Sequence, residues 1–310
     1  MNTSNSKISV EALPFRAERA EWVDQARRRD RAVLPDNHTQ NEQKMNKTIQ
    51  LYLLLISTLF LPQGAKAQCK IMNNSFKDGE SIVYDLYFNY GIVNAKAGVG
   101  SLKTDMVNYK DNSAYNLRML LNTTGLPGSI YTVNDTLVSY IDMDLRPLLF
   151  TKNAFEGKDY SREVQSFSYT AGDIKVRTSR IFNGKKKFEE TIITNDCTYD
   201  YLSVLALIRN LDYSGMKPGD QQQIKFLSGR EIVNMAVNYN GTSNIKANDG
   251  KTYNTIQISL TIYDKAFKNQ KEAISASLTD DSNRIPIVIN THLKIGVIRA
   301  VLKNVTGLRN

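Results

Sequence analysis

Apolar and polar residues alternate with a period of two through most of the chain after residue 68. Residues 115–122 are one example, because one side of the run carries four apolar residues, Tyr115, Leu117, Met119 and Leu121. This alternation is typical of a β-strand that is buried on one face. Similar runs predict further strands at residues 83–90, 174–181, 188–193, 223–227, 232–239, 255–263, 273–278 and 285–293.

Turn signals separate these runs. Asn183-Gly184 lies between the runs 174–181 and 188–193 and suits a tight hairpin turn that needs positive φ angles. Gly241 and the group 248–250 (Asn-Asp-Gly) are expected to be turns as well. The chain therefore has the pattern of an antiparallel sheet with short connections.

One segment has the spacing of a helix. Over residues 201–211 the apolar side chains recur at the helical positions Tyr201, Val204, Leu205, Ile208 and Leu211. Either the residue before this run or Thr198 can cap its first N–H groups. We expect a mainly β fold, with a strongly curved antiparallel sheet (half-barrel or barrel-like) and one amphipathic helix near 200–211 that plugs or covers it.

Residues 45–67 have the three parts of a secretory signal peptide. Lys47 supplies a basic start, residues 51–61 are mostly apolar, and Ala65-Lys66-Ala67 is a small-residue cleavage pattern. The apolar run is too short to span a membrane as a helix. We expect cleavage between Ala67 and Gln68, export to the periplasm, and no transmembrane span.

Residues 1–44 fit no part of such a signal. They hold eight basic and seven acidic residues, which gives them almost no net charge and argues against a nucleic-acid-binding arm. We expect a disordered leader produced by a start codon assigned too early, with Met45 as the true initiator. Residues 68–310 are then one exported β domain, and no nucleic-acid partner is expected.

The two cysteines of the chain, Cys69 and Cys197, both lie in the part expected to be exported. The formal net charge of the whole chain is +9, and the basic residues that produce it are dispersed along the sequence. In an oxidising compartment the two cysteines can form a disulfide. Two free thiols and a lipid-modified Cys69 remain the alternatives.

Few residues suggest chemistry. His292 is the single histidine after residue 68, no nucleophile-elbow serine is present, and no His/Cys spacing suits zinc. Asp142 and Asp144, on one expected strand face, form a weak calcium motif. We therefore assign no catalytic residue, no cofactor and no metal. Five charged residues interrupt apolar patterns and form a candidate polar cluster, either as ion pairs or as a polar ligand site: Glu80, Asp200, Arg209, Asp281 and Arg284.

Several short motifs occur in a characteristic order. They are residues 76–80 (Phe-Lys-Asp-Gly-Glu) with Tyr84, Ala97-Gly98, Ser139 with Asp142, the helix 200–209, residues 217–219 (Lys-Pro-Gly), residues 278–286 and Gly296. In this order the chain resembles the family catalogued as domain of unknown function 3108, over residues 76–303. The resemblance implies an exported, mostly antiparallel β protein of a Gram-negative bacterium, and it carries no activity. The abundance of asparagine, glutamine and tyrosine is typical of Bacteroidota.

Three functions remain open. The first is a non-catalytic periplasmic binder or carrier of an apolar or glycan-like ligand, such as a lipid or a glycan, which requires a concave apolar face that the helix does not fill. The second is a structural or assembly factor that contacts an envelope protein, which requires a filled core and an exposed apolar patch. The third is a carboxylate-based hydrolase, which requires two carboxylates converging in a cleft.

Overall fold

The computed structural model describes residues 69–124, 132–170, 172–263, 273–292 and 296–310. Ala65–Asn310 forms one compact unit of the chain. The expected leader 1–44, the expected signal peptide 45–67 and the cleavage residues Ala67 and Gln68 lie outside the described residues. The fold described below is that of the part expected to be exported.

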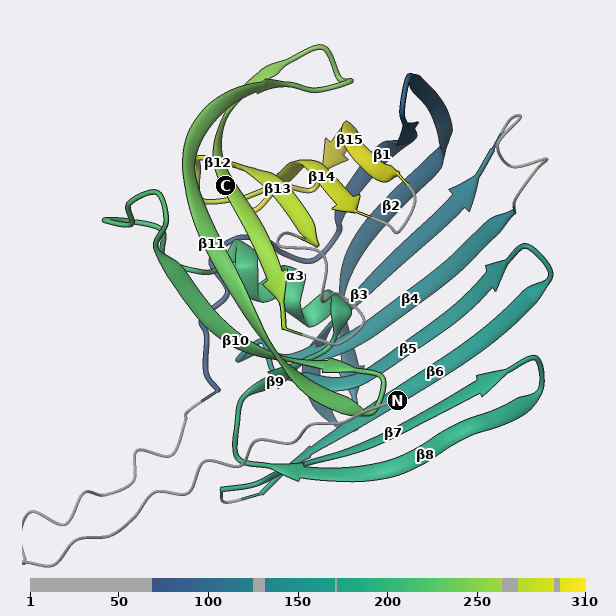
Figure 1. The fold of residues 1–310 in the computed structure, drawn as a ribbon. Helices are drawn as coiled ribbons and strands as arrows, with labels where there is room; N and C mark the ends of the chain where they lie inside the picture. The colour runs from purple at the N-terminus through teal and green to yellow at the C-terminus, as the bar shows by residue number, and fades with distance from the viewer. Residues whose placement is uncertain (1–68, 125–131, 171, 264–272, 293–295) are drawn as a thin grey trace, which may run out of the picture. The chain divides into compact units, whose positions relative to one another are not determined.

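The described residues form one sheet of fifteen strands and one α-helix (Figure 1). The helix is α3 (Tyr201–Arg209). The strands are β1 (Glu80–Tyr90), β2 (Val93–Tyr109), β3 (Asn112–Thr123), β4 (Val133–Asp142), β5 (Pro147–Glu156), β6 (Asp159–Tyr169), β7 (Ile174–Phe182), β8 (Lys185–Thr194), β9 (Thr198–Tyr199), β10 (Gln221–Ser228), β11 (Glu231–Lys246), β12 (Thr252–Ile262), β13 (Ile274–Thr279), β14 (Pro286–His292) and β15 (Val297–Thr306).

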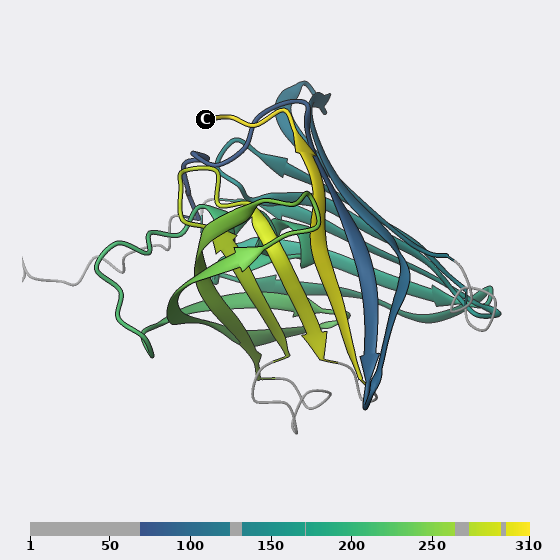
Figure 2. The same cartoon turned by 90° about the horizontal axis from the view of Figure 1, so that it is seen from above.

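The strands pair in the order β8-β7-β6-β5-β4-β3-β2-β1-β15-β14-β13-β12-β11-β10-β9. Every pairing is antiparallel except the short one between β9 and β10. The two edge strands, β8 and β9, follow each other in the chain, so the sheet curls until its two ends approach (Figure 2). The prediction of a curved, barrel-like antiparallel sheet is confirmed, and the sheet is not closed by a ladder.

Side chains hold the two ends of the sheet near each other. On β7, the Thr178 hydroxyl donates to the Gly229 carbonyl in the β10–β11 turn at 2.8 Å. Val176 of β7 and Leu227 of β10 share a small buried cluster. An ion pair of 3.0 Å joins Arg230 to Glu190 of β8. The curl therefore depends on packing between the sheet ends rather than on strand pairing.

Asparagine and glycine explain one hairpin turn, one bulge and one close approach in the sheet. Asn183 and Gly184 have φ angles of 48° and 74°, and they connect β7 to β8 in the predicted hairpin. Gly241, which was predicted as a turn, instead lies inside β11, where the register with β12 shifts. Its φ of 96° gives a bulge, so one long strand continues through it. Gly98 of β2 is required by close approach, because a Cβ there would lie 2.0 Å from the Asn122 carbonyl oxygen.

Helix α3 lies inside the curl and ends two residues earlier than expected. Different faces of the helix pack against three different parts of the sheet, and each contact forms its own buried cluster. Leu207 and Ile208 pack on β10–β13, Leu205 on β1 and β15, and Leu202 and Ala206 on β3–β5. A helix that is apolar on all sides belongs in a core. It fills the interior of the sheet like a plug.

Candidate functional site

A buried ion pair fixes the C-terminal end of α3. Arg209, in its last turn, meets both carboxylate oxygens of Glu80 on β1, at 2.6 and 2.8 Å. The two side chains are 2% and 1% exposed. A planar guanidinium facing a carboxylate through two parallel bonds is a strong, directional contact. The pair therefore sets both the depth and the rotation of the helix inside the sheet.

The remaining donors of Arg209 are also satisfied. Its guanidinium donates to the carbonyl of Asn283 at 2.9 Å and to that of Ser75 at 3.2 Å. The Ser75 hydroxyl donates in turn to the Arg209 carbonyl at 2.6 Å, and the guanidinium lies over the ring of Phe76. With its donors used inside the protein, Arg209 has little left for a ligand. We call this group of contacts the Arg209 lock.

A second polar contact fixes the other end of the helix. Asp200 is the N-cap, and its carboxylate accepts from the N–H groups of Leu202 and Ser203 at 2.8 and 2.9 Å. The Ser203 hydroxyl accepts from the Asp200 N–H, which completes a capping box. The Ser139 hydroxyl of β4 donates to the same carboxylate at 2.7 Å. Burial raises the pKa of Asp200, and these hydrogen bonds oppose that rise.

Asp281 and Arg284 lie in the turn between β13 and β14. Asp281 accepts from Thr279 at 2.6 Å and from the N–H groups of Asn283 and Arg284. The Arg284 side chain pairs with Asp280 at 3.0 Å. The five candidate residues thus form three arrangements: the Glu80–Arg209 pair, the Asp200 cap and this turn. The Asn283 carbonyl connects the turn to the Arg209 lock.

The weak calcium motif has a local partner. Asp142 ends β4 and accepts from Arg146 at 2.7 Å, whereas Asp144 lies in the following turn, 3.6 Å from the same guanidinium. The sequence predicted that the two carboxylates share a strand face. This prediction is wrong, because β4 ends at Asp142 and Asp144 lies outside the strand. No group of three or more His, Cys, Asp or Glu side chains suited to a metal ion is found within the described ranges.

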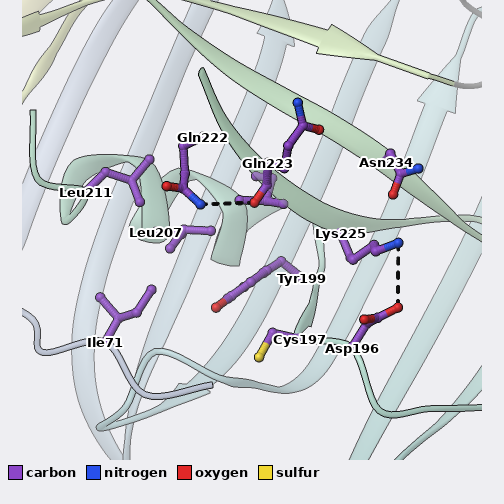
Figure 3. A pocket seen from close by; sticks show the side chains of 11 residues that line it. Ile71, Asp196, Cys197, Tyr199, Leu207, Leu211, Gln222, Gln223, Lys225 and Asn234 are labelled. Atoms are coloured by element: carbon purple, nitrogen blue, oxygen red, sulfur yellow. Dashed lines mark hydrogen bonds and ion pairs between the residues drawn. The ribbon is translucent and has the colours of Figure 1, made fainter. Parts of the chain in front are cut away.

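A hollow of about 330 Å³ opens beside the helix (Figure 3). On one wall are Leu207 and Leu211, and on another is Ile71 of the segment that precedes β1. The remaining lining residues come from β9, β10, β11 and the turn before β9: Asp196, Cys197, Tyr199, Gln222, Gln223, Ile224, Lys225 and Asn234. Apolar side chains form its floor, and the Lys225–Asp196 ion pair of 3.6 Å lies at its rim.

The cysteine of this hollow belongs to a covalent link. Cys197 and Cys69 form a disulfide in the structure, with their Cα atoms 5.4 Å apart. The link ties the segment 69–76 to the turn between β8 and β9. Ile71 of the same segment donates its N–H to the Asp144 carbonyl. One wall of the hollow is therefore held by both covalent and hydrogen bonds.

Elsewhere the helix leaves almost no room. Beside Phe76, Leu102 and Arg209, the free volume is about 10 Å³, which suits no more than one water molecule. Near it lies the Thr104 hydroxyl, a buried group that lacks a hydrogen-bond partner among the described residues. Of the two spaces, only the hollow beside β10 has the size of a small ligand-binding pocket, which begins at about 300 Å³.

A family model matches residues 83–303, and this family is described as protein of unknown function (DUF3108). The chain belongs to the DUF3108 family. No curated protein matches it. A crystal structure of a beta-barrel-like protein of DUF1849 from Brucella abortus is similar, with a TM-score of 0.54 and 12% identity over 76% of this chain and 100% of that one. A protein with a YmcC-like fold from Bacteroides fragilis has a TM-score of 0.32 and 9% identity over 76% of this chain and 99% of that one.

This DUF3108 chain shares its fold with the Brucella protein, and at such low identity the likeness shows the fold alone. Among its described residues, no helix has the length and apolar character needed to cross a membrane. The motifs 76–80, Ser139, 200–209 and 278–286, which carried the family resemblance, supply the Arg209 lock and the Asp200 cap. The binder hypothesis required an apolar concave face that the helix does not fill, but its position and lining residues were not predicted. The one local signal for that position is the uncharged run Gln221-Gln222-Gln223 at the start of β10.

The Arg209 lock predicts a large and non-additive loss of stability. Arg209→Met should lower the free energy of unfolding by about 3–5 kcal/mol, because Glu80 is left charged and buried. The double variant Glu80→Met/Arg209→Met should lose less than the sum of the two single variants, which urea unfolding measures. Arg230→Met, which breaks an exposed ion pair, is the control and should lose under about 1 kcal/mol. Additive losses would contradict the lock.

Asp200 predicts a pH effect. Its pKa is raised by burial, so above about pH 4 the native state keeps a proton that the unfolded state has released, and stability falls as the pH rises through this range. Asp200→Asn lacks this titration. Its stability relative to the wild type should therefore improve between about pH 4 and about pH 7. Asp220→Asn, the same change at an exposed carboxylate, is the control. A difference that does not vary with pH would contradict the assignment.

Proposed function

We propose that this DUF3108 protein is an exported, non-catalytic binding protein whose ligand places an apolar group in the hollow beside β10. The observation that carries the proposal is the hollow itself. It is a half-open, mostly apolar space next to a helix that otherwise fills the interior of the sheet. The helix, the segment 69–76 and the three strands β9, β10 and β11 build its walls, so the space is present before any ligand arrives.

The polar groups around the helix support binding rather than catalysis. Glu80 and Arg209 are committed to each other, and Asp200 is committed to the helix cap and Ser139. Hydrolysis by two carboxylates requires both to face a substrate, whereas the hollow has one carboxylate in its lining, Asp196, which is paired with Lys225. Apolar contact is therefore what the hollow offers most.

A role in envelope assembly is the second candidate. The interior is mostly filled, and the tip between β1 and β2 exposes Ile92 completely, with Tyr90 beside it 57% exposed. Such a tip suits contact with another envelope component. It lies at a turn rather than in a hollow, so this candidate predicts a protein partner and leaves the hollow without a role.

Export from the signal at residues 45–67 gives the first prediction of this proposal. N-terminal sequencing of the protein recovered from the periplasm should begin at Gln68. Its intact mass should rise by about two daltons on reduction if Cys69 and Cys197 are bridged in solution. A protein that begins at Met1 and stays in the cytoplasm would contradict export, and an unchanged mass would contradict the bridge.

Binding in the hollow is tested with the neutral apolar dye N-phenyl-1-naphthylamine. Its fluorescence should rise saturably with the wild-type chain. Leu211→Trp fills the hollow and should weaken binding by about tenfold or more. Ile193→Trp adds the same side chain on β8, where Ile193 is 68% exposed, and should bind as the wild type does.

Thermal unfolding shows whether each variant is folded. If Leu211→Trp does not fold, Ile71→Trp replaces it, because Ile71 lines the same hollow from another segment. Dye binding that is unsaturable, or equal in all folded variants, would reject the hollow as the binding site.

A further inference from the structure

Strand β10 has a free edge where it borders the hollow. On one side β10 pairs with β11 along its whole length, from Gln221 to Ser228. On the other side it pairs with β9 only at Lys225 and Phe226. Before that point the residues Gln222 to Ile224 line the hollow, as do the turn residues 196 and 197. The stretch from Gln221 to Ile224 is therefore an edge within the described part of the sheet.

The bonding direction of this edge follows from its register. The Tyr239 N–H donates to the Asp220 carbonyl at 2.9 Å, and in an antiparallel ladder the backbone groups that face one partner recur at every second residue. Gln222 and Ile224 thus bond to β11, while the N–H and C=O groups of Gln221 and Gln223 point to the free edge. The Gln222 side-chain amide donates to the Gln223 carbonyl at 3.2 Å, in an exposed position (Figure 3).

We propose that the ligand of the hollow is an extended polypeptide segment that adds to β10 as a short strand. The proposal rests on the proposed binding function of the hollow and specifies its ligand class. Alternating N–H and C=O groups along an edge are matched by another peptide backbone, whereas a lipid chain or a glycan has no such alternation. β9 occupies the edge from Lys225 onward, so the added strand spans about four residues.

Side chains of the added strand would find two different environments. In a strand, successive side chains point to opposite faces. One face of β10 carries Ile224 and borders the apolar floor with Leu207 and Leu211. The other carries Gln223 and Lys225, beside Asp196 at the rim. The edge therefore favours a segment that alternates apolar and polar residues, with an apolar residue directed into the hollow.

The opposite edge of the sheet has the reverse character. On β8, charged side chains occupy most of its first half, with Lys185, Lys186 and Lys187 followed by Glu189 and Glu190. Charges, lysine above all, are the usual means by which edge strands avoid pairing with other chains. The β10 edge instead begins with three uncharged glutamines. Charged side chains therefore protect the β8 edge from pairing with another chain, whereas the β10 edge has free backbone N–H and C=O groups and no such charged run.

The test uses the full chain and an acetylated peptide of alternating valine and threonine between two glutamates, with the same peptide N-methylated at each valine as control. Gln223→Pro removes the N–H that points to the free edge, and proline is tolerated on an edge. Gln223→Ala keeps that N–H. In a titration, the affinity for the peptide should fall about tenfold with Gln223→Pro or with the N-methylated peptide, and it should stay near the wild-type value with Gln223→Ala. In a separate measurement, the bound peptide should slow amide hydrogen exchange at Gln221 and Gln223.

The naphthylamine dye separates the two levels of the argument. The peptide should displace the dye from the wild-type chain, and the N-methylated peptide should not. Two results would overturn strand addition but not binding in the hollow. The first is dye binding without peptide binding, and the second is peptide binding of equal affinity with Gln223→Pro or with the N-methylated peptide. Displacement of the dye by dodecanoate but not by the peptide would assign the hollow to a lipid and overturn strand addition too. Dimers that Gln223→Pro dissociates would assign the edge to a second copy. If the wild-type chain does not bind the dye at all, the hollow is rejected as a binding site.

Discussion

The buried pair between Arg209 and Glu80 is the constraint on which the structure depends. Two charges removed from water are tolerated only when each is matched by the other and by further hydrogen bonds, and here the carbonyls of Ser75 and Asn283 supply them. These partners come from the segment before β1, from β1 itself and from the turn before β14. The single pair therefore joins β1 and the turn before β14, which belong to the middle of the sheet, to the helix that lies inside it.

The helix in turn explains why the sheet is curled but unclosed. Fifteen strands could enclose a wide interior, and α3 fills it by packing on three separate clusters. Closing the ladder would require β8 to pair with β9 or β10, yet β9 has two residues and β8 carries a charged outer edge. The ends meet through Thr178, Glu190 and the β10–β11 turn instead. The unpaired part of β10, and the hollow beside it, follow from this incomplete closure.

Period-two alternation predicted the strand-rich fold, and the Asn183-Gly184 dipeptide predicted the hairpin between β7 and β8, because both signals depend on neighbours in sequence. Several strands, such as β2 and β6, were not delimited, since polar residues on their inner faces, Thr104 and Gln165 among them, hide the alternation. The helix was found from its apolar spacing, but the burial of most of its side chains depends on the curl of the whole sheet. Gly241 has the sequence signal of a turn, and the strand partner decides that it is a bulge. The sequence could not assign all partners of the candidate charged residues, because Ser139 reaches Asp200, and Asn283 reaches Arg209, only through long-range pairing. The pair between Asp280 and Arg284 is local, four residues apart in one turn.

The disulfide and the free edge act on the same space. Cys197 lines the hollow, and its bond to Cys69 holds the segment that carries Ile71, which lines the hollow as well. A binding surface that is ordered before the ligand arrives loses less conformational entropy on binding. A short peptide makes few contacts, so such pre-organisation decides whether it binds measurably at all. An open strand edge is also a risk for aggregation, and the short length left by β9, together with the walls on both sides, restricts this edge to a segment of a few residues.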